Sequence, residues 1–429
     1  MVGVHGPRRM QTVETLESNV RSYSRSFPAV FSRARGSIMF TEGGRKVIDF
    51  LSGAGALNYG HNNQEIKAAI TKYLESDGVI HGLDMATPAK VEFMETFSSV
   101  ILRERNLCYR FQFTGPTGAN AVEAALKLSR KITGRHNVIS FTNGYHGHSL
   151  GALAASGNRF YRNASSIPLS GTTFMPYDGY LGSADSPADY VRKVLMDESS
   201  GIDLPAAILV ETVQGEGGIN VAGKEWLQSI QALAKEVGAI FIVDDIQMGC
   251  GRTGEFFSFE FAALSPDIVV MSKSLSGYGL PLSMLLIKEA IDAWEPGEHT
   301  GTFRGNNLAL VSGKAAVTLY WRNQMFSQQV QRLGAFMRRR LDAIAHQYGN
   351  KFAVRGRGMV CGFDCKTTQI AEATSHKAFK KGLIIERCGA TDQVVKFLPA
   401  LTIDQDTLGQ GLDIFEESLT ETLNSAQGS

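Results

Sequence analysis

The sequence predicts an α/β fold, in which helices cover a mostly parallel sheet, together with a smaller α+β domain. Residues 239–243 and 267–271 are short apolar runs, rich in β-branched residues and bounded by turn residues, which is typical of buried parallel strands. From about residue 88, segments with helix and strand patterns alternate along the chain, as they do in α/β domains. From residue 327 onward this clean alternation is lost, and that change indicates the second domain.

The other elements follow from the same apolar patterns and from the turn residues between them. Near the N-terminus we expect an amphipathic helix over residues 12–24, strands at 37–40 and 47–51, and a helix that begins near Gln64. In the central part we expect strands at 110–113, 137–141, 206–210 and 284–287, and helices at 121–133, 223–238 and 308–322. In the last part we expect a helix at 327–348, strands near 360–363, 382–385 and 394–399, and a final helix at 406–423.

Composition and charge limit the classes of function. The chain has 429 residues, of which 43% are hydrophobic, so it can form a large core and two domains. Its formal net charge of +1 gives no electrostatic reason to expect nucleic acid or an anionic membrane surface as a partner. No apolar run approaches the roughly 20 residues that a membrane span needs.

Cysteine and histidine usage points to a cytoplasmic protein without a metal site. The five cysteines are an odd number in a long chain, so we expect reduced thiols. No apolar stretch follows Arg8 and Arg9, so the start of the chain does not predict a secretory signal. His146 and His148 lie two residues apart with no third ligand in view, so we expect no metal there.

An acidic residue and a lysine follow two of the expected strands. Asp244 ends the run 239–243, and Lys273 comes shortly after the run 267–271. Open α/β sheets bind ligands at the carboxyl ends of their strands. A lysine amine there can form a Schiff base with an aldehyde cofactor, and a carboxylate can keep a pyridine nitrogen protonated. The pair therefore indicates a pyridoxal 5′-phosphate site, although a helix-capping Asp244 and a solvated Lys273 would explain each residue taken alone.

Other segments supply what such a cofactor needs. The small residues of loop 114–120 precede a helix, whose first N–H groups and dipole favour a phosphate, although many strand-to-helix turns look similar. Tyr145 can stack on a flat ring, or it can be a packing aromatic. Gln247 lies three residues after Asp244 and can bind a phenolic oxygen. Glutamates follow the strand 206–210 where a ligand is expected.

Taken together, these motifs resemble those of the class III (ω-amino) aminotransferases, over residues 16–423. The specific signal is the order of Asp244-Asp245-Ile246-Gln247, Gly251-Arg252-Thr253-Gly254, Ser272-Lys273 and Gly301-Thr302-Phe303-Arg304-Gly305-Asn306. Within this family, residues 57–63, 213–223 and 272–281 resemble the diaminobutyrate–2-oxoglutarate transaminases of ectoine synthesis. The resemblance implies fold type I, with a seven-stranded sheet between helices and a small domain built from both termini.

The resemblance also implies roles for individual residues. Lys273 and Asp244 are the expected catalytic residues, and the same two residues bind pyridoxal phosphate. The other residues expected at the cofactor are Pro116, Thr117, Tyr145, Glu211, Gln247 and Thr302. Thr302 is expected to reach the phosphate in a neighbouring subunit, which implies an obligate homodimer.

The residues expected at the substrate are Tyr23, Arg25, Glu216 and Lys396, and Glu211 is also expected to face it. Lys396 stands where many family members carry an arginine that clamps a carboxylate. Because lysine lacks the two-pronged guanidinium, its grip on a carboxylate should be weaker or differently aimed. His148 likewise stands where some members carry arginine.

The expected reaction is a ping-pong transfer of an amino group from glutamate to aspartate 4-semialdehyde, which gives L-2,4-diaminobutyrate. The alternatives are another ω-amine substrate (ornithine, 4-aminobutyrate or a secondary metabolite), an aminomutase of the same fold, and a scaffold that has lost catalysis. We expect four segments: a disordered extension (1–10), the N-terminal part of the small domain (11–72), the large cofactor-binding domain (73–315) and the C-terminal part of the small domain (316–429).

Overall fold

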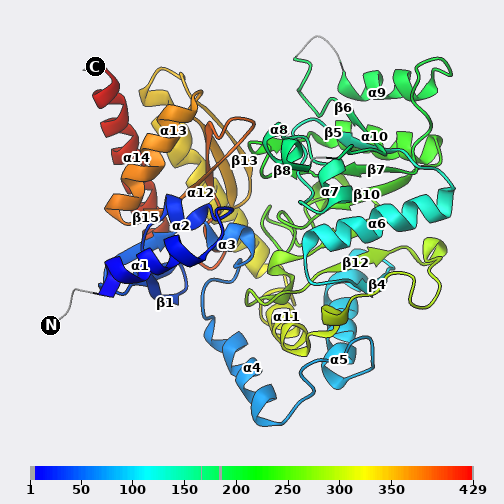
Figure 1. The fold of residues 1–429 in the computed structure, drawn as a ribbon, viewed down its shortest axis with the longest axis horizontal. Coiled ribbons are helices and arrows are strands. Elements are labelled where there is room, and N and C mark those ends of the chain that lie inside the picture. Colours follow the sequence, from blue (N-terminus) through cyan, green and yellow to red (C-terminus); the bar gives the residue numbers. More distant parts are fainter. Residues whose placement is uncertain (1–4, 166, 183–185, 428–429) are drawn as a thin grey trace.

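A computed structural model describes residues 5–165, 167–182 and 186–427, which form a large and a small domain side by side (Figure 1). The large domain is built on a seven-stranded sheet in the order β4-β12-β11-β10-β7-β5-β6. All neighbours pair in parallel except β12, which is antiparallel to both β11 and β4. This confirms the predicted mostly parallel, seven-stranded sheet. Its strands are β4 (Arg110–Phe113), β5 (Val138–Phe141), β6 (Thr172–Met175), β7 (Ala207–Val210), β10 (Ile240–Asp244), β11 (Ile268–Met271) and β12 (Met284–Ile287).

Helices cover both faces of this sheet, as the continuous apolar strands require. Successive side chains of β7 and β10 enter two separate core clusters, because neighbouring residues of a strand point to opposite faces. Helix α6 (Gly118–Thr133) contributes to one cluster, and α5 (Pro88–Phe97), α10 (Lys224–Glu236) and α11 (Asn307–Tyr320) contribute to the other. Smaller elements complete the domain: α4 (Gln64–Glu75), α7 (Leu150–Ala154), α8 (Arg159–Arg162), α9 (Pro187–Met196), β8 (Val213–Gln214) and β9 (Asn220–Val221).

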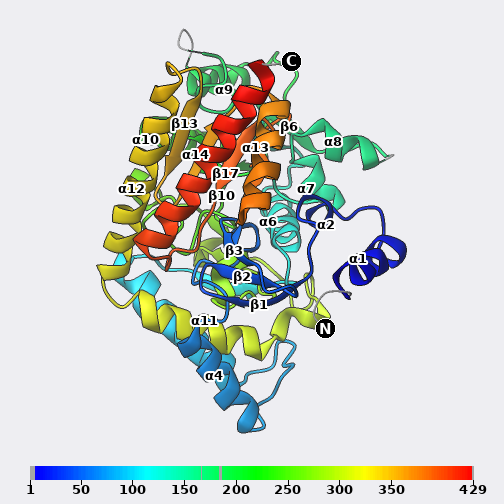
Figure 2. The same ribbon diagram turned by 90° about the vertical axis from the view of Figure 1, so that its left-hand side faces the viewer.

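The small domain combines segments from both ends of the chain. Its first sheet, β1-β2-β3-β15, places β15 parallel to β3, so that a C-terminal strand completes an N-terminal sheet. Its second sheet has the order β13-β14-β17-β16 and packs with α12, α13 and α14 (Figure 2). The elements are β1 (Phe31–Arg35), β2 (Ile38–Thr41), β3 (Lys46–Asp49), α3 (Ser52–Gly55), α12 (Met325–Gln347), β13 (Ala353–Arg357), β14 (Val360–Asp364), α13 (Thr368–Lys381), β15 (Leu383–Ile384), β16 (Glu386–Cys388), β17 (Val394–Phe397) and α14 (Gln405–Gln427).

The N-terminal segment differs from the prediction. Instead of one helix over 12–24, the chain forms α1 (His5–Leu16) and a short α2 (Tyr23–Ser26). The Ser18 hydroxyl accepts a hydrogen bond from the Val20 N–H, and such local bonds compete with helix continuation. Residues 5–10, assigned to a disordered extension, lie within α1, where a proline in the first turn removes no helical hydrogen bond. Residues 1–4 lie outside the described residues.

The expected boundaries after residues 72 and 315 fall inside α4 and α11. These two helices pack against each other at the lower edge of Figure 1, so α4 lies with the large domain. Among the described residues, no helix is long and apolar enough to cross a membrane.

A buried arginine of the large domain forms hydrogen bonds with the small domain. Arg252 of the large domain is fully buried and donates hydrogen bonds to the carbonyl oxygens of Met359 (2.9 Å) and Pro399 (2.6 Å). It also donates to Asn58 Oδ1 at 2.6 Å. Burial lowers the pKa of Arg252 to about 9. The guanidinium therefore joins three distant segments through neutral oxygen atoms.

Candidate active site

The catalytic pair expected from the sequence lies at one edge of the large sheet. Strands β10 and β11 are parallel neighbours, with Asp244 opposite Val270, and Lys273 begins the turn that follows β11. The Lys273 Nζ atom donates a hydrogen bond of 2.9 Å to the carbonyl oxygen of Ala54. Burial lowers the pKa of Lys273. The Lys273 amine therefore lies at the carboxyl edge of the sheet, where a ligand was expected.

Asp244 is held by a histidine whose role the sequence did not predict. His146 Nδ1 lies 2.7 Å from Asp244 Oδ2, and both side chains are buried. Asp244 Oδ1 accepts a hydrogen bond of 3.1 Å from the Ile246 N–H. Burial acts to lower the pKa of His146, but the hydrogen bond and the negative charge of Asp244 outweigh it and raise the pKa. His146 therefore holds the Asp244 carboxylate in place.

Gln247 and the glycine-rich loop 53–56 meet beside Lys273. The Gln247 Nε2 atom donates to the Ala54 carbonyl oxygen and to Glu216 Oε1, both at 3.0 Å. Gln247 Oε1 is buried, and no described residue gives it a hydrogen bond. Because an orphaned buried acceptor implies a missing donor, a ligand with a hydroxyl group fits this position. The carbonyl oxygen of Ala54 in this segment accepts hydrogen bonds from both Gln247 and Lys273.

The turn that was expected to bind an anion leads into the N-terminus of α6. The Thr117 hydroxyl caps the helix by accepting a hydrogen bond of 3.2 Å from the Asn120 N–H. The first N–H groups of a helix have no helical acceptor, and they point out of the helix toward any bound anion. A Cβ atom on Gly118 would lie 2.8 Å from Ile246 Cδ1, so a larger residue there would require the Ile246 side chain to shift. Pro116 lies in the same turn.

The loop that carries Thr302 adjoins this turn in the same chain. A Cβ atom on Gly301 would lie 3.4 Å from both Cα and N of Gly115. Thr302 begins a short 3-10 turn, Thr302–Gly305. The N-terminus of a helix, a Gln247 oxygen without a described hydrogen-bond donor and a carboxylate beside His146 together fit the phosphate, hydroxyl and ring nitrogen of pyridoxal phosphate.

Tyr145 and Glu211 lie together on another side of the site. The Tyr145 N–H donates a hydrogen bond of 3.0 Å to Glu211 Oε2. The Tyr145 ring is half-buried, with the rings of His148 and Tyr161 at 5.4 and 5.9 Å. Burial raises the pKa of Glu211 to about 8 and that of Tyr145 to about 12. Glu211 therefore holds or releases a proton near neutral pH.

Lys396 is fully buried between two glutamates. Its Nζ atom donates a hydrogen bond of 2.7 Å to Glu216 Oε1 and lies 2.9 Å from Glu386 Oε1. Strands β16 and β17 place Glu386 and Lys396 directly opposite each other. The Tyr23 hydroxyl donates a hydrogen bond of 3.0 Å to Glu386 Oε2. Lys396 therefore cannot meet a substrate carboxylate without a change in these pairings.

The charges of this cluster shift one another's pKa values. Burial acts to raise the pKa of Glu216, but the ammonium groups of Lys396 and Lys273 outweigh it and lower the pKa to about 2. Burial acts to lower the pKa of Lys396, whereas Glu216 and Glu386 raise it well above its ordinary value. Burial raises the pKa of Glu386, and the Glu216 carboxylate adds to that effect. Glu216 and Lys396 therefore remain charged at neutral pH.

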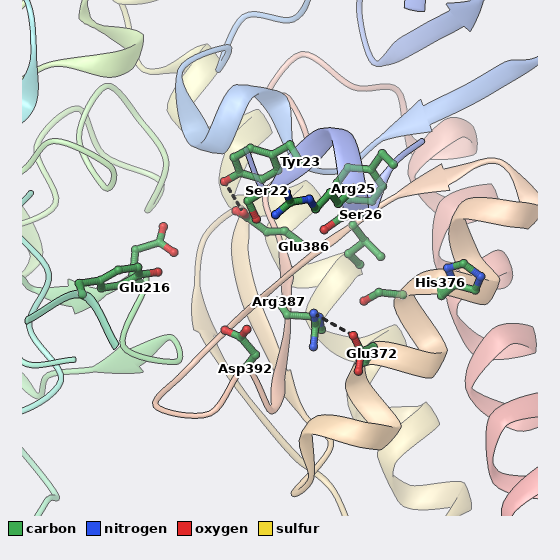
Figure 3. A pocket seen from close by; sticks show the side chains of 14 residues that line it. Ser22, Tyr23, Arg25, Ser26, Glu216, Glu372, His376, Glu386, Arg387 and Asp392 are labelled. Atoms are coloured by element: carbon green, nitrogen blue, oxygen red, sulfur yellow. Dashed lines mark hydrogen bonds and ion pairs between the residues drawn. The ribbon is translucent and has the colours of Figure 1, made fainter. Parts of the chain in front are cut away.

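A cavity of about 340 Å³ opens beside this cluster, between the two domains (Figure 3). Glu216 reaches it from the large domain, and Tyr23 and Glu386 face it from the small domain. Arg25 lies on the same wall and donates hydrogen bonds to the carbonyl oxygen and Oδ1 of Asn19 at 3.0 and 3.1 Å. All four residues expected at the substrate thus lie in or next to one cavity.

In the described part of the chain, no group of three or more histidine, cysteine or acidic side chains could hold a metal ion.

Comparisons with known proteins show the family to which the chain belongs. Residues 20–419 match the family model of the class-III aminotransferases. The chain is 60% identical to an uncharacterized aminotransferase of Sinorhizobium fredii, over 96% of this chain and 92% of that protein. It is 53% identical to a diaminobutyrate–2-oxoglutarate transaminase of Bordetella parapertussis, over 97% of both chains. An ornithine aminotransferase structure from Toxoplasma gondii shares the fold, with a TM-score of 0.84 and 23% identity over 98% of this chain and 95% of that one.

Proposed function

The chain belongs to the class-III aminotransferases, and on that premise we propose that it moves an amino group between glutamate and the terminal carbon of L-2,4-diaminobutyrate. In the diaminobutyrate-forming direction, aspartate 4-semialdehyde accepts the amine and 2-oxoglutarate is released. The observation that carries this choice of substrate is the acidic cavity beside Lys273, in which two carboxylates share one lysine. An aldehyde or amine that also carries an ammonium group suits such a wall. The diaminobutyrate transaminase relative adds support, and it favours a place in ectoine synthesis.

Pyridoxal phosphate, when bound, supplies an electron sink for the charge left on a substrate carbon after proton removal. We propose that the N-terminal turn of α6, with Pro116 and Thr117, holds the phosphate. Asp244, supported by His146, accepts a hydrogen bond from the ring nitrogen, and Gln247 meets the phenolic oxygen. Tyr145 stacks on the ring, and Glu211 lies beside it. Thr302 binds the phosphate in the neighbouring subunit.

Lys273 carries the proton in this proposal. Burial lowers the pKa of Lys273, which favours the neutral amine that must accept the proton from the substrate carbon at Nζ. The same atom can then return the proton at a second position. Because glutamate and the diamine react in separate half-reactions, the scheme is ping-pong.

An exposed apolar surface supports a homodimer. Residues 79–85 and 303–306 lie next to each other. The Gly82 N–H donates a hydrogen bond of 2.9 Å to the Gly305 carbonyl oxygen, and the ring centroids of His81 and Phe303 are 5.5 Å apart. Five large side chains of these segments are exposed: Val79, Ile80, Leu83, Met85 and Phe303. Contiguous exposed apolar side chains mark association surfaces. We propose that a second copy covers them, and that this places Thr302 at the partner's site. The five free thiols favour the cytoplasm.

A panel of amino donors tests the reaction. The cofactor-loaded protein is supplied with 2-oxoglutarate and with 2,4-diaminobutyrate, ornithine or 4-aminobutyrate, and glutamate is measured. Ornithine differs from diaminobutyrate by one methylene, so we expect a kcat/KM about 10-fold or more higher for diaminobutyrate. Equal or higher values for ornithine or 4-aminobutyrate would refute this choice of substrate. Conversion of the amine without glutamate formation would indicate an aminomutase.

A further inference from the structure

The cavity between the domains carries an excess of negative charge. Its charged lining consists of four carboxylates and two guanidinium groups: Glu216, Glu372, Glu386, Asp392, Arg25 and Arg387. Glu372 and Arg387 form an ion pair at 3.6 Å on the small domain. The inner end of the cavity is formed by Glu216 and Glu386, with Lys396 buried behind them.

Both oxygen atoms of the inner carboxylate Glu386 have a partner, but its ammonium partner is shared. Glu386 is only 8% exposed, and its Oε2 atom accepts the hydrogen bond from Tyr23. Its Oε1 atom lies 2.9 Å from Lys396 Nζ, which also donates a hydrogen bond of 2.7 Å to Glu216 Oε1. Two carboxylates that line the cavity therefore share a single ammonium group.

The charge of the cluster specifies the kind of donor. Glu216, Glu386 and Lys396 together contain two acidic groups and one ammonium, so the ionised cluster has one negative charge in excess. A second ammonium, placed in the cavity beside Glu386, would balance that charge and could donate a charge-assisted hydrogen bond to the carboxylate. A ligand carboxylate at the same place would be repelled.

We propose that Glu386 binds the α-ammonium group of the substrate, and so selects amines that carry an α-amino acid at the end remote from the transferred nitrogen. This inference rests on the proposed function, because it assigns the far end of the diamine to the cavity. Arg25 faces the same cavity, and in the described structure its hydrogen bonds go to Asn19, a neutral residue. It is therefore placed to meet the α-carboxylate of the same substrate.

A purely structural role for Glu386, as a counterion of Lys396, makes a different prediction. Loss of a structural counterion would disturb the cavity for every amine alike. Loss of an ammonium-binding group would affect only amines that have the α-ammonium. Two matched pairs of amines separate these cases: 2,4-diaminobutyrate with 4-aminobutyrate, and ornithine with 5-aminopentanoate. Within each pair the carbon chain is the same and only the α-ammonium differs.

The decisive variant is Glu386→Gln, which keeps the shape of the side chain and removes its charge. In the cofactor-loaded enzyme we expect kcat/KM to fall about 10- to 100-fold for the two α-amino acids, mainly through KM. The values for 4-aminobutyrate and 5-aminopentanoate should change less than about 3-fold. Calorimetric binding of diaminobutyrate to borohydride-reduced enzyme, which cannot turn over, should weaken to a similar degree.

Glu372→Gln is the matched control, because Glu372 also lines the cavity but is already paired with Arg387. The Glu372→Gln variant should leave kcat/KM unchanged for all four amines. If Glu386→Gln does not fold, Glu386→Asp replaces it, because aspartate keeps the charge but has a side chain shorter by one methylene. This variant should lower kcat/KM for 2,4-diaminobutyrate and ornithine by a smaller factor. An equal loss within each matched pair, or no loss, would overturn the proposal. If the enzyme prefers ornithine, the proposed substrate fails, but the ornithine pair still tests Glu386.

Discussion

Replacement of Lys396 by methionine tests the buried cluster most directly, because it leaves two carboxylates without their shared ammonium. The pKa of Glu216 is about 2, compared with an ordinary value of 4.5. A difference of about 2.5 pKa units corresponds to roughly 3 kcal/mol of folding free energy at neutral pH, at 1.36 kcal/mol per unit. The measured cost of breaking buried ion pairs, about 3–5 kcal/mol, has the same size.

The expected change in melting temperature follows from the size of the chain. At about 2.1 cal/mol/K per residue, the unfolding entropy of 429 residues is about 0.9 kcal/mol/K, so Lys396→Met should lower the melting temperature by about 3 °C. The matched control is Lys381→Met. Lys381 also bridges two glutamates, Glu417 at 2.8 Å and Glu421 at 2.9 Å, but these lie at the surface. We expect no measurable shift in the control.

The pH dependence has a definite direction. In the unchanged protein the pKa of Glu216 is depressed, so its stabilising contribution is present above about pH 4.5 and is lost as the pH falls toward 2. In Lys396→Met, burial without the ammonium raises the pKa of both carboxyls, so the variant loses stability as the pH rises. The difference in melting temperature between the two proteins should therefore be small only near pH 2, be present already at pH 5, and grow further toward pH 8. Equal shifts for Lys396→Met and Lys381→Met, or a difference that does not change with pH, would refute the reasoning.

Three further substitutions test the proposed roles. Lys273→Ala should lower the rate of the glutamate half-reaction more than about 100-fold, because it removes the proton carrier, whereas Lys288→Ala, which alters a partly exposed ion pair with Asp267, should not. His146→Phe should lower kcat/KM about 10- to 100-fold, because it removes a hydrogen bond to the Asp244 carboxylate. The control is His148→Phe, which should have a small effect because the His148 ring packs beside Tyr145. Equal effects of the two substitutions would contradict the positioning role of His146. Phe303→Asp should yield a monomer, as measured by light scattering, that binds the cofactor more weakly. A variant that remains dimeric would show that the interface lies elsewhere.

Local patterns were sufficient to predict most of the fold. The buried strands β10 and β11 are short, apolar and bounded by turn residues, and the structure confirms them as parallel neighbours. The start of the first helix was not predicted, because residues 5–10 have no strong apolar period and a proline near the start reads as a break. The boundary between the domains was also hidden, because α4 packs on α11, more than 200 residues away in the sequence.

The position of a candidate residue was predictable where it follows from its place after a strand, as for Asp244 and Lys273. It was not predictable where function depends on contacts across the fold. Ala54 acts through its carbonyl oxygen, which any residue has. Glu386 is an ordinary residue of a short strand until the register places it opposite Lys396. His146 was considered only as a metal ligand, although its place in the turn after β5 brings it to the end of β10.

The choice of lysine at position 396 has a consequence for a two-substrate cycle. A lysine ammonium is a compact charge with three donors, so it can serve two carboxylates from different elements, whereas a guanidinium offers a planar fork to one. If both half-reactions share this cavity, a diamine adds a positive charge beside Glu386, and glutamate adds a negative one. The first substrate is compatible with the pairings of Lys396 as they stand. The second requires Glu216 to release Lys396 or Arg25 to meet the carboxylate, because an anion cannot approach the intact cluster without a new cationic partner.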